Sequence, residues 1–167
     1  MRALGPQFEG QFVQPNPQYQ LSNPPYTSAP AGAGQFVAAP GGLIQGRFGW
    51  GDPSTGLASN VPTAGATLGV VLPYAGWRAD WGRVYFDPTV NAYRIREGLN
   101  VTLMTGGPFW LRFAAGAVAG QPVYASNVDG AALSGYTAEA TLTPWKVSTP
   151  TAPGGLAIVS TSAFYGA

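Results

Sequence analysis

The chain has 167 residues with a net charge of +1, and its 24 glycines and 16 prolines give these two types about twice their usual share. Only 9% of the residues are charged against the usual quarter, so a basic stripe for nucleic acid and charge-rich disorder are both excluded. Cysteine and histidine are absent, which excludes disulfides, thiolate metal sites and the commonest general base.

No apolar stretch approaches the roughly 20 residues that cross a bilayer, and Met1–Gly10 has no apolar signal region, so we expect a soluble chain. Seven of the eight cations are arginine, and glutamate is scarce. Protein interfaces favour arginine and aromatic residues and are poor in lysine and glutamate. The composition therefore indicates a surface that binds other proteins, with a low-charge bias of the source as the alternative.

The N-terminal quarter of the chain predicts an extended arm. Between Glu9 and Arg47 lie 37 residues without a charge, and seven of the sixteen prolines fall in Met1–Pro40. Ordering about 40 residues costs roughly 40–80 kcal/mol, and offsetting even the lower figure needs a contact of roughly 1,600 Å². We therefore expect residues 1–46 to form a partner-binding arm rather than part of a core, with a flexible linker as the alternative. The expected anchors are its spaced aromatic residues: Phe8, Phe12, Tyr19, Tyr26 and Phe36.

From Arg47 onward, short apolar runs end at Gly, Pro, Asn or Asp, which is typical of an all-β domain. We expect residues 47–167 to form a compact antiparallel β-barrel or sandwich, a jelly roll included, that folds without the arm and buries Trp50 and Trp110. The predicted strands are Gly46–Trp50, Thr67–Leu72, Gly82–Phe86, Ala92–Arg96, Asn100–Met104, Pro108–Phe113, Pro122–Ser126, Ala131–Tyr136, Trp145–Thr149 and Leu156–Thr161.

The clearest hairpin joins Val123–Ser126 to Ala131–Ser134 through Asn127–Gly130. Asp129–Gly130 can adopt the positive φ angles that a tight turn needs. Asp129 is therefore interpreted as a turn residue rather than as a carboxylate with a chemical role.

The stretch Trp77–Tyr93 concentrates Trp, Tyr, Phe and Arg, and it has three interpretations. It forms a core hairpin that turns at Asp87–Pro88, a subunit or partner interface, or an aromatic platform for a ligand. The residues assigned to the interface are Trp77, Arg78, Trp81, Arg83 and Tyr85.

Catalysis has little support in this sequence. Asp80, Asp87, Glu97, Asp129 and Glu139 show no spacing that predicts a paired acid and base. Nucleophile elbows, phosphate-binding glycine loops and metal-ligand clusters are all missing. We expect no enzyme activity, no catalytic residue, no metal and no cofactor.

A succession of short motifs resembles the structural cement or decoration proteins of tailed-phage heads. In that family a glycine-rich "GRFAW"-like stretch leads into a "VTL…FW" segment and then a "GQ/DxVYA…G" hairpin. The matching stretches here, in the same order, are Gly41–Leu43, Gly46–Trp50, Ile95–Leu103, Phe109–Trp110, Ala119–Ala125 and Asp129–Gly130.

This resemblance implies a protein made in the host cytoplasm that binds the outer surface of the virion capsid and bridges neighbouring major capsid protein subunits. It also implies self-association, with a homotrimer favoured over a dimer, and partners that include neither nucleic acid nor membrane. One alternative is a carbohydrate-binding or host-attachment β module that stacks sugars on Trp77, Trp81 and Tyr85. Another is a tail or adaptor component of the same particle.

Overall fold

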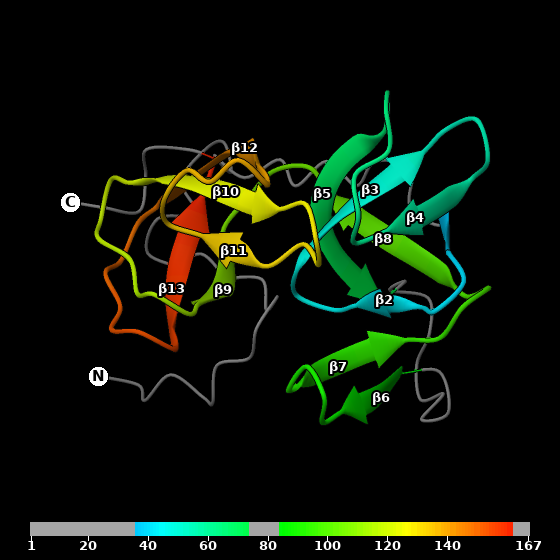
Figure 1. Cartoon of the computed structure of the whole chain (residues 1–167), viewed down its shortest axis with the longest axis horizontal. Helices are drawn as coiled ribbons and strands as arrows, with labels where there is room; N and C mark the ends of the chain where they lie inside the picture. The colour runs from blue at the N-terminus through cyan, green and yellow to red at the C-terminus, as the bar shows by residue number, and fades with distance from the viewer. Residues whose placement is uncertain (1–35, 74–83, 162–167) are drawn as a thin grey trace, which may run out of the picture.

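The computed structural model describes residues 36–73 and 84–161, and within these ranges it contains thirteen β-strands and no helix. The strands form two closed five-stranded barrels and one three-stranded sheet (Figure 1). The all-β prediction is confirmed, and the barrel alternative holds rather than the sandwich. The sequence had suggested one barrel, whereas the chain builds two that stand side by side.

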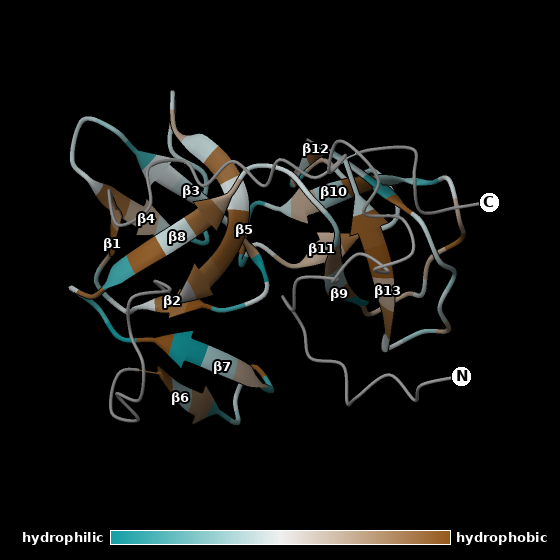
Figure 2. Cartoon of the chain, turned by 180° about the vertical axis from the view of Figure 1, so that it is seen from behind, coloured by the Kyte–Doolittle hydropathy of each residue, from teal (hydrophilic) through white to brown (hydrophobic). Residues whose placement is uncertain are grey.

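Barrel 1 has the strand order β1-β4-β3-β5-β8, in which only the β1–β4 pair is parallel. The three central residues of β8 are buried in a row, and apolar and paler residues alternate along this strand in Figure 2. In β3 the inward positions are glycines. A Cβ on Gly51 would lie 2.7 Å from the Phe36 ring, so glycine makes room for this ring in the barrel. The strands are β1 (Phe36–Ala38), β3 (Phe48–Asp52), β4 (Leu57–Ser59), β5 (Thr67–Pro73) and β8 (Asn100–Met104).

Barrel 2 has the order β10-β11-β9-β13-β12, and β12 closes the barrel by pairing with β10. Only the β11–β9 pair is parallel. The strands are β9 (Phe109–Phe113), β10 (Pro122–Ser126), β11 (Ala132–Leu133), β12 (Ala140–Val147) and β13 (Gly155–Ser160).

Barrel 2 repeats the topology of barrel 1 strand for strand. In each barrel the first strand runs parallel to the third and antiparallel to the fifth, and the second lies between the third and the fourth. The register repeats as well. Gly51 pairs with Ala58 in β3–β4, and Ala125 pairs with Ala132 in β10–β11.

Hydrogen bonds of the turns follow the same repeat. The Gly56 amide donates to the Asp52 carbonyl at 2.8 Å, and the Gly130 amide donates to the Ser126 carbonyl at 2.9 Å. Both glycines have φ near +70°, the conformation that closes this turn. The two barrels are therefore two versions of one supersecondary unit.

The three-stranded sheet consists of β2 (Leu43–Ile44), β7 (Ala92–Ile95) and β6 (Val84–Asp87), in the order β2-β7-β6. Its β6–β7 hairpin lies below barrel 1 in Figure 1. Leu43 and Ile95 of this sheet are buried in the interior of barrel 1. The sheet is thus attached through its inner end, while its outer end projects.

Two apolar cores hold the molecule together. The smaller core fills barrel 1 and comprises Phe36, Ala38, Leu43, Ala58, Val71, Ile95, Val101 and Leu103. The larger core fills barrel 2 around Trp145 and continues into outward-facing residues of barrel 1, with the rings of Phe48 and Trp145 5.4 Å apart. The barrels are consequently joined by a shared core.

Most of the sequence-predicted strands exist with shifted ends, and the hairpin β10–β11 is confirmed. Trp50 is buried as expected, but Trp110 is only partly buried. The strands β1, β2 and β4 were not predicted, because two or three residues carry too little periodicity. Phe36 needs a correction: it is 2% exposed inside barrel 1, so the β domain includes residues 36–46, which the sequence had assigned to the arm.

Candidate functional site

The outer end of the β6–β7 hairpin exposes an aromatic pair. Phe86 and Tyr93 lie directly opposite each other across the two strands, and their rings meet edge to face with centroids 5.6 Å apart. Phe86 is 50% exposed and Tyr93 is 51% exposed. Because Val84 and Ile95 occupy the same face further in, this aromatic pair continues an apolar stripe outward from the core of barrel 1. We call Phe86 and Tyr93 the hairpin patch.

The opposite face of the hairpin pairs its charges internally. The Arg94 Nε donates to Asp87 Oδ2 at 2.9 Å, and the Arg96 guanidinium lies 4.9 Å from the centre of the Tyr85 ring. The hydroxyl of Thr89 donates to Asp87, and this bond, followed by Arg94, holds the pKa of the Asp87 carboxyl below its ordinary value of 3.8. The hairpin therefore presents an apolar face without an unpaired carboxylate next to it.

A second apolar surface lies on the outside of barrel 2. Tyr124 pairs with Leu133 on one side and Leu142 on the other, so the three side chains form a row across three strands. The Tyr136 ring meets Tyr124 edge to face at 6.0 Å. Tyr136 is 74% exposed and Leu142 is 61% exposed. We call these four residues the barrel-2 patch.

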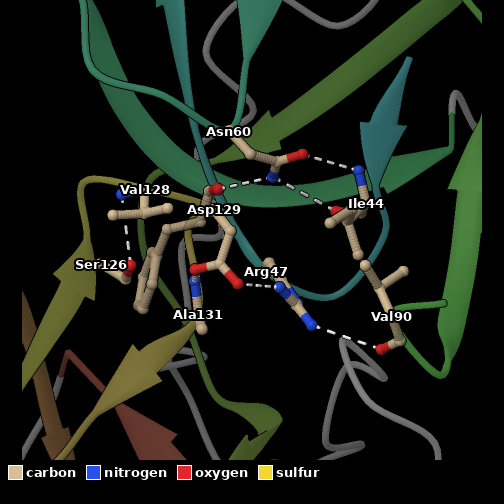
Figure 3. Close-up of polar contacts among 9 residues, drawn as sticks. Ile44, Arg47, Asn60, Val90, Ser126, Val128, Asp129 and Ala131 are labelled. Carbon is tan, nitrogen blue, oxygen red and sulfur yellow. Dashed lines mark hydrogen bonds and ion pairs between the residues drawn. The ribbon is translucent and has the colours of Figure 1, made fainter. Parts of the chain in front are cut away.

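Beside the shared apolar core, a polar cluster lies where the three parts of the fold meet (Figure 3). Arg47, which precedes β3, forms an ion pair with Asp129 in the β10–β11 turn and donates to the Val90 carbonyl in the β6–β7 turn at 3.4 Å. Buried Asn60 accepts a bond from the Ile44 amide at 2.7 Å and donates to the Phe48 carbonyl at 2.8 Å. These contacts fix the hairpin and barrel 2 relative to barrel 1.

The structure places only some of the residues that the sequence had singled out. Tyr85 lies on β6 and is exposed, as an interface requires, and Asp87–Pro88 does form the hairpin turn. Asp129 is a turn residue, since its Oδ1 accepts the Ala131 amide, but it also carries the ion pair with Arg47 that the sequence did not reveal. Phe36 is a core residue. The remaining candidates lie outside the described residues: Phe8, Phe12, Tyr19, Tyr26, Trp77, Arg78, Trp81 and Arg83.

Sequence reasoning missed the barrel-2 patch and did not separate Phe86 and Tyr93 from their neighbours. The sequence did contain a signal for the hairpin patch. Phe86 and Tyr93 lie close to the predicted turn, and each stands two residues from an apolar residue of its own strand, Val84 or Ile95. Tyr136 and Leu142 gave no such signal, since they become neighbours of Tyr124 only when β12 closes the barrel.

The carboxylates of Asp52, Asp87, Glu97 and Asp129 each bind a separate set of groups rather than one another. Asp52 accepts from Ser54, and Glu97 accepts from the Gly41 amide. Ser54 lowers the pKa of Asp52. Among residues 36–73 and 84–161, no group of three or more acidic side chains is placed to hold a metal ion. The same ranges contain no helix long and apolar enough to span a membrane.

A protein-family model described as XM1 gp53 minor capsid protein matches residues 20–161, which include both barrels and the hairpin. The chain belongs to this family. Members of the XM1 gp53 family are structural proteins of the phage capsid, so the chain is a virion component that associates with other capsid components. The resemblance to phage head proteins is thereby confirmed at the level of the capsid. No curated protein matches the chain.

Proposed function

We propose that this member of the XM1 gp53 family is a cement protein that binds the outer surface of the capsid and bridges major capsid protein subunits. The observation that carries the proposal is the presence of two exposed apolar surfaces on different barrels of one chain. A protein that joins others needs at least two contact surfaces, and exposed Tyr, Phe and Leu clusters supply the desolvation energy for such contacts.

The hairpin patch is assigned to a major capsid subunit, together with the arm residues Phe8, Phe12, Tyr19 and Tyr26. Neither set carries charge, so the contact depends on apolar burial. We expect binding to change little with salt, since salt screens only interactions between charges.

The barrel-2 patch is assigned to another copy of the chain. Its row has a counterpart in barrel 1, where Trp50 pairs with Ser59 and Leu68. That row is covered within the chain, because Trp50 is 4% exposed and belongs to the core that fills barrel 2. No residue of ranges 36–73 and 84–161 covers the equivalent face of barrel 2 in this way, since Tyr136 is 74% and Leu142 is 61% exposed, which favours a second copy as its partner. A homotrimer is expected, with a dimer as the alternative.

Two other roles have weaker support. A sugar-stacking site would use the face of Tyr85, but the Arg96 guanidinium already lies over that ring. A tail or adaptor component would share the fold, and it differs from a cement protein in its position on the particle.

The test uses capsids assembled without this chain. Purified full-length protein is added back, and its occupancy, its position in a particle reconstruction and the heat resistance of the capsid are measured. We expect saturable binding on the outer surface at the junctions of major capsid subunits, with increased resistance to heat. Binding at the tail or portal, or saturation without any gain in heat resistance, would refute the cement function.

A further inference from the structure

The two barrels differ most in the connection between their fourth and fifth strands. Val71 of β5 and Val147 of β12 are equivalent. Each amide donates to the carbonyl of the residue just before the second strand of its barrel, Arg47 at 2.8 Å in barrel 1 and Gln121 at 2.9 Å in barrel 2. Val71 pairs with Leu103 of β8, and Val147 pairs with Val159 of β13.

Beyond these residues, both chains reach a second equivalent point. In barrel 1, Ile95 pairs with Leu43, and in barrel 2, Thr151 pairs with Ala117 as an isolated bridge. Each pair is preceded by a glycine of positive φ, Gly42 or Gly116, that packs against the carbonyl of Ile95 or Thr151. Barrel 2 joins its two points through residues 148–150, whereas barrel 1 uses residues 72–94, which include β6 and most of β7.

Barrel 2 thus shows that this barrel closes without a hairpin. The hairpin nevertheless has its own supports. Arg94 binds Asp87 and also donates to the Gly41 carbonyl at 3.0 Å, and Arg47 holds the turn at Val90. Barrel closure does not need this segment, yet its contacts hold Phe86 and Tyr93 in a half-exposed position. Such a rigid, exposed pair is suited to binding a partner.

We propose that the β6–β7 hairpin is an insertion into one half of a duplicated barrel. Through this insertion the chain binds a major capsid subunit. This inference rests on the proposed cement function. The partner surface is a neutral apolar groove that receives Phe86 and Tyr93, because the charges beside them are already paired or stacked. Among the described residues, the aromatic face carries Val84, Phe86, Tyr93 and Ile95 and no cation that would attract nucleic acid or an anionic surface.

The experiment copies the short connection of barrel 2 into barrel 1. In the shortened chain, residues 74–94 are replaced by one proline, so that Pro73 is followed by this proline and Ile95, as Thr149 is followed by Pro150 and Thr151. A second variant keeps the hairpin and carries Phe86→Ser and Tyr93→Ser. The matched control is Val118→Ser, since Val118 is exposed on barrel 2 outside both patches.

We expect the shortened chain to unfold cooperatively and to keep its β circular dichroism, while its affinity for capsids falls at least tenfold. The double variant should show the same loss with an unchanged fold, and Val118→Ser should bind as the full chain does. If the shortened chain does not fold, the hairpin is not an insertion. If the double variant binds capsids with undiminished affinity, the hairpin does not bind the major capsid subunit. Either result leaves the cement function intact if the full chain still binds and protects capsids, so the two failures are distinguishable.

Discussion

At the scale of single residues, a few groups each hold two parts of the fold together. Asn60 satisfies an amide of β2 and a carbonyl of β3 at once, and Gly130 brings the β10–β11 turn against β3. The Phe48 amide donates to the Gly130 carbonyl at 2.8 Å. A buried polar group that loses its partner costs about 1–3 kcal/mol, so substitutions here act on the whole molecule.

Gly130→Ala should destabilise the protein strongly. Its φ is +70°, and an added Cβ would lie 2.0 Å from the Phe48 carbonyl oxygen. Left-handed strain of roughly 1–2 kcal/mol adds to an overpacking cost of about 1–3 kcal/mol, so we expect a loss of about 2–5 kcal/mol in urea unfolding. Gly120→Ala is the control, because its φ is +86° but nothing lies within 4 Å of the added Cβ. Equal losses for the two variants would contradict the close approach of the turn to β3.

The carboxyl of Asp87 should titrate below 3.8 in the folded protein. Its ionised form is stabilised by Thr89 and Arg94, so it contributes stability above the unfolded-state pKa, and this contribution disappears as the pH falls through the folded-state pKa. Thr89→Val removes the largest cause and should raise the pKa of Asp87 toward 3.8. An NMR titration of the Asp87 carboxyl carbon measures this change. An unchanged titration curve would show that Thr89 does not set the pKa.

At the scale of elements, a strand of only three residues is needed to close a barrel. The three residues of β1 close barrel 1, since β1 pairs with β4 on one side and β8 on the other. The aromatic ring of Phe36 fills the space that Gly51 in β3 leaves. The boundary between arm and barrel therefore lies before Phe36 rather than after Gly46.

Two truncations place this boundary. Removing residues 1–30 should leave cooperative unfolding and a dispersed amide spectrum, because β1 remains. Removing residues 1–39 deletes β1 and should destabilise the protein by at least the 3–5 kcal/mol typical of losing a buried Phe, about the whole stability of a marginal domain. If both truncated chains unfold at the same urea concentration, β1 is not part of the barrel in solution.

At the scale of the whole molecule, the chain has duplicated one barrel and then given the two copies different surfaces. The outward face of barrel 1 became part of the core that fills barrel 2, and the equivalent row of barrel 2 stayed exposed. Barrel 1 alone carries the hairpin. The two barrels thus differ in the outer surfaces that are proposed to bind other proteins, and they share the strand pairing that closes each barrel.

Leu142→Glu should abolish self-association of the free chain. A carboxylate in the middle of the row would have to be desolvated on contact with a second copy, and a buried unpaired charge is strongly unfavourable. Sedimentation equilibrium at tens of micromolar should give a closed oligomer for the natural chain and a monomer for the variant. Val61→Glu, at an exposed position of barrel 1, is the control and should remain oligomeric. A monomeric natural chain would refute the assignment of the barrel-2 patch.

Much of the fold was accessible from local patterns. Alternating apolar runs between turn residues predicted β8 and β10 with their observed ends, and Asp129–Gly130 predicted the β10–β11 turn. The hairpin at Asp87–Pro88 was among the interpretations of the aromatic stretch. The repeat of the barrel could not be predicted from the sequence, because few positions of the two halves are identical. One trace of it is that Gly46 and Gly56 have the same spacing as Gly120 and Gly130.

The sequence by itself determined the all-β class, the neutral surface and the lack of residues for common catalysis, because these depend on composition and on periodicity within a few residues. Only the tertiary structure decided that there are two barrels, that Phe36 is a core residue and that Tyr136 stands beside Tyr124. Barrel closure pairs strands that are distant in the chain, such as β1 with β8. That closure decides which apolar residues are covered and which remain exposed for a partner. Local sequence patterns cannot predict this, because they do not contain the long-range strand pairing.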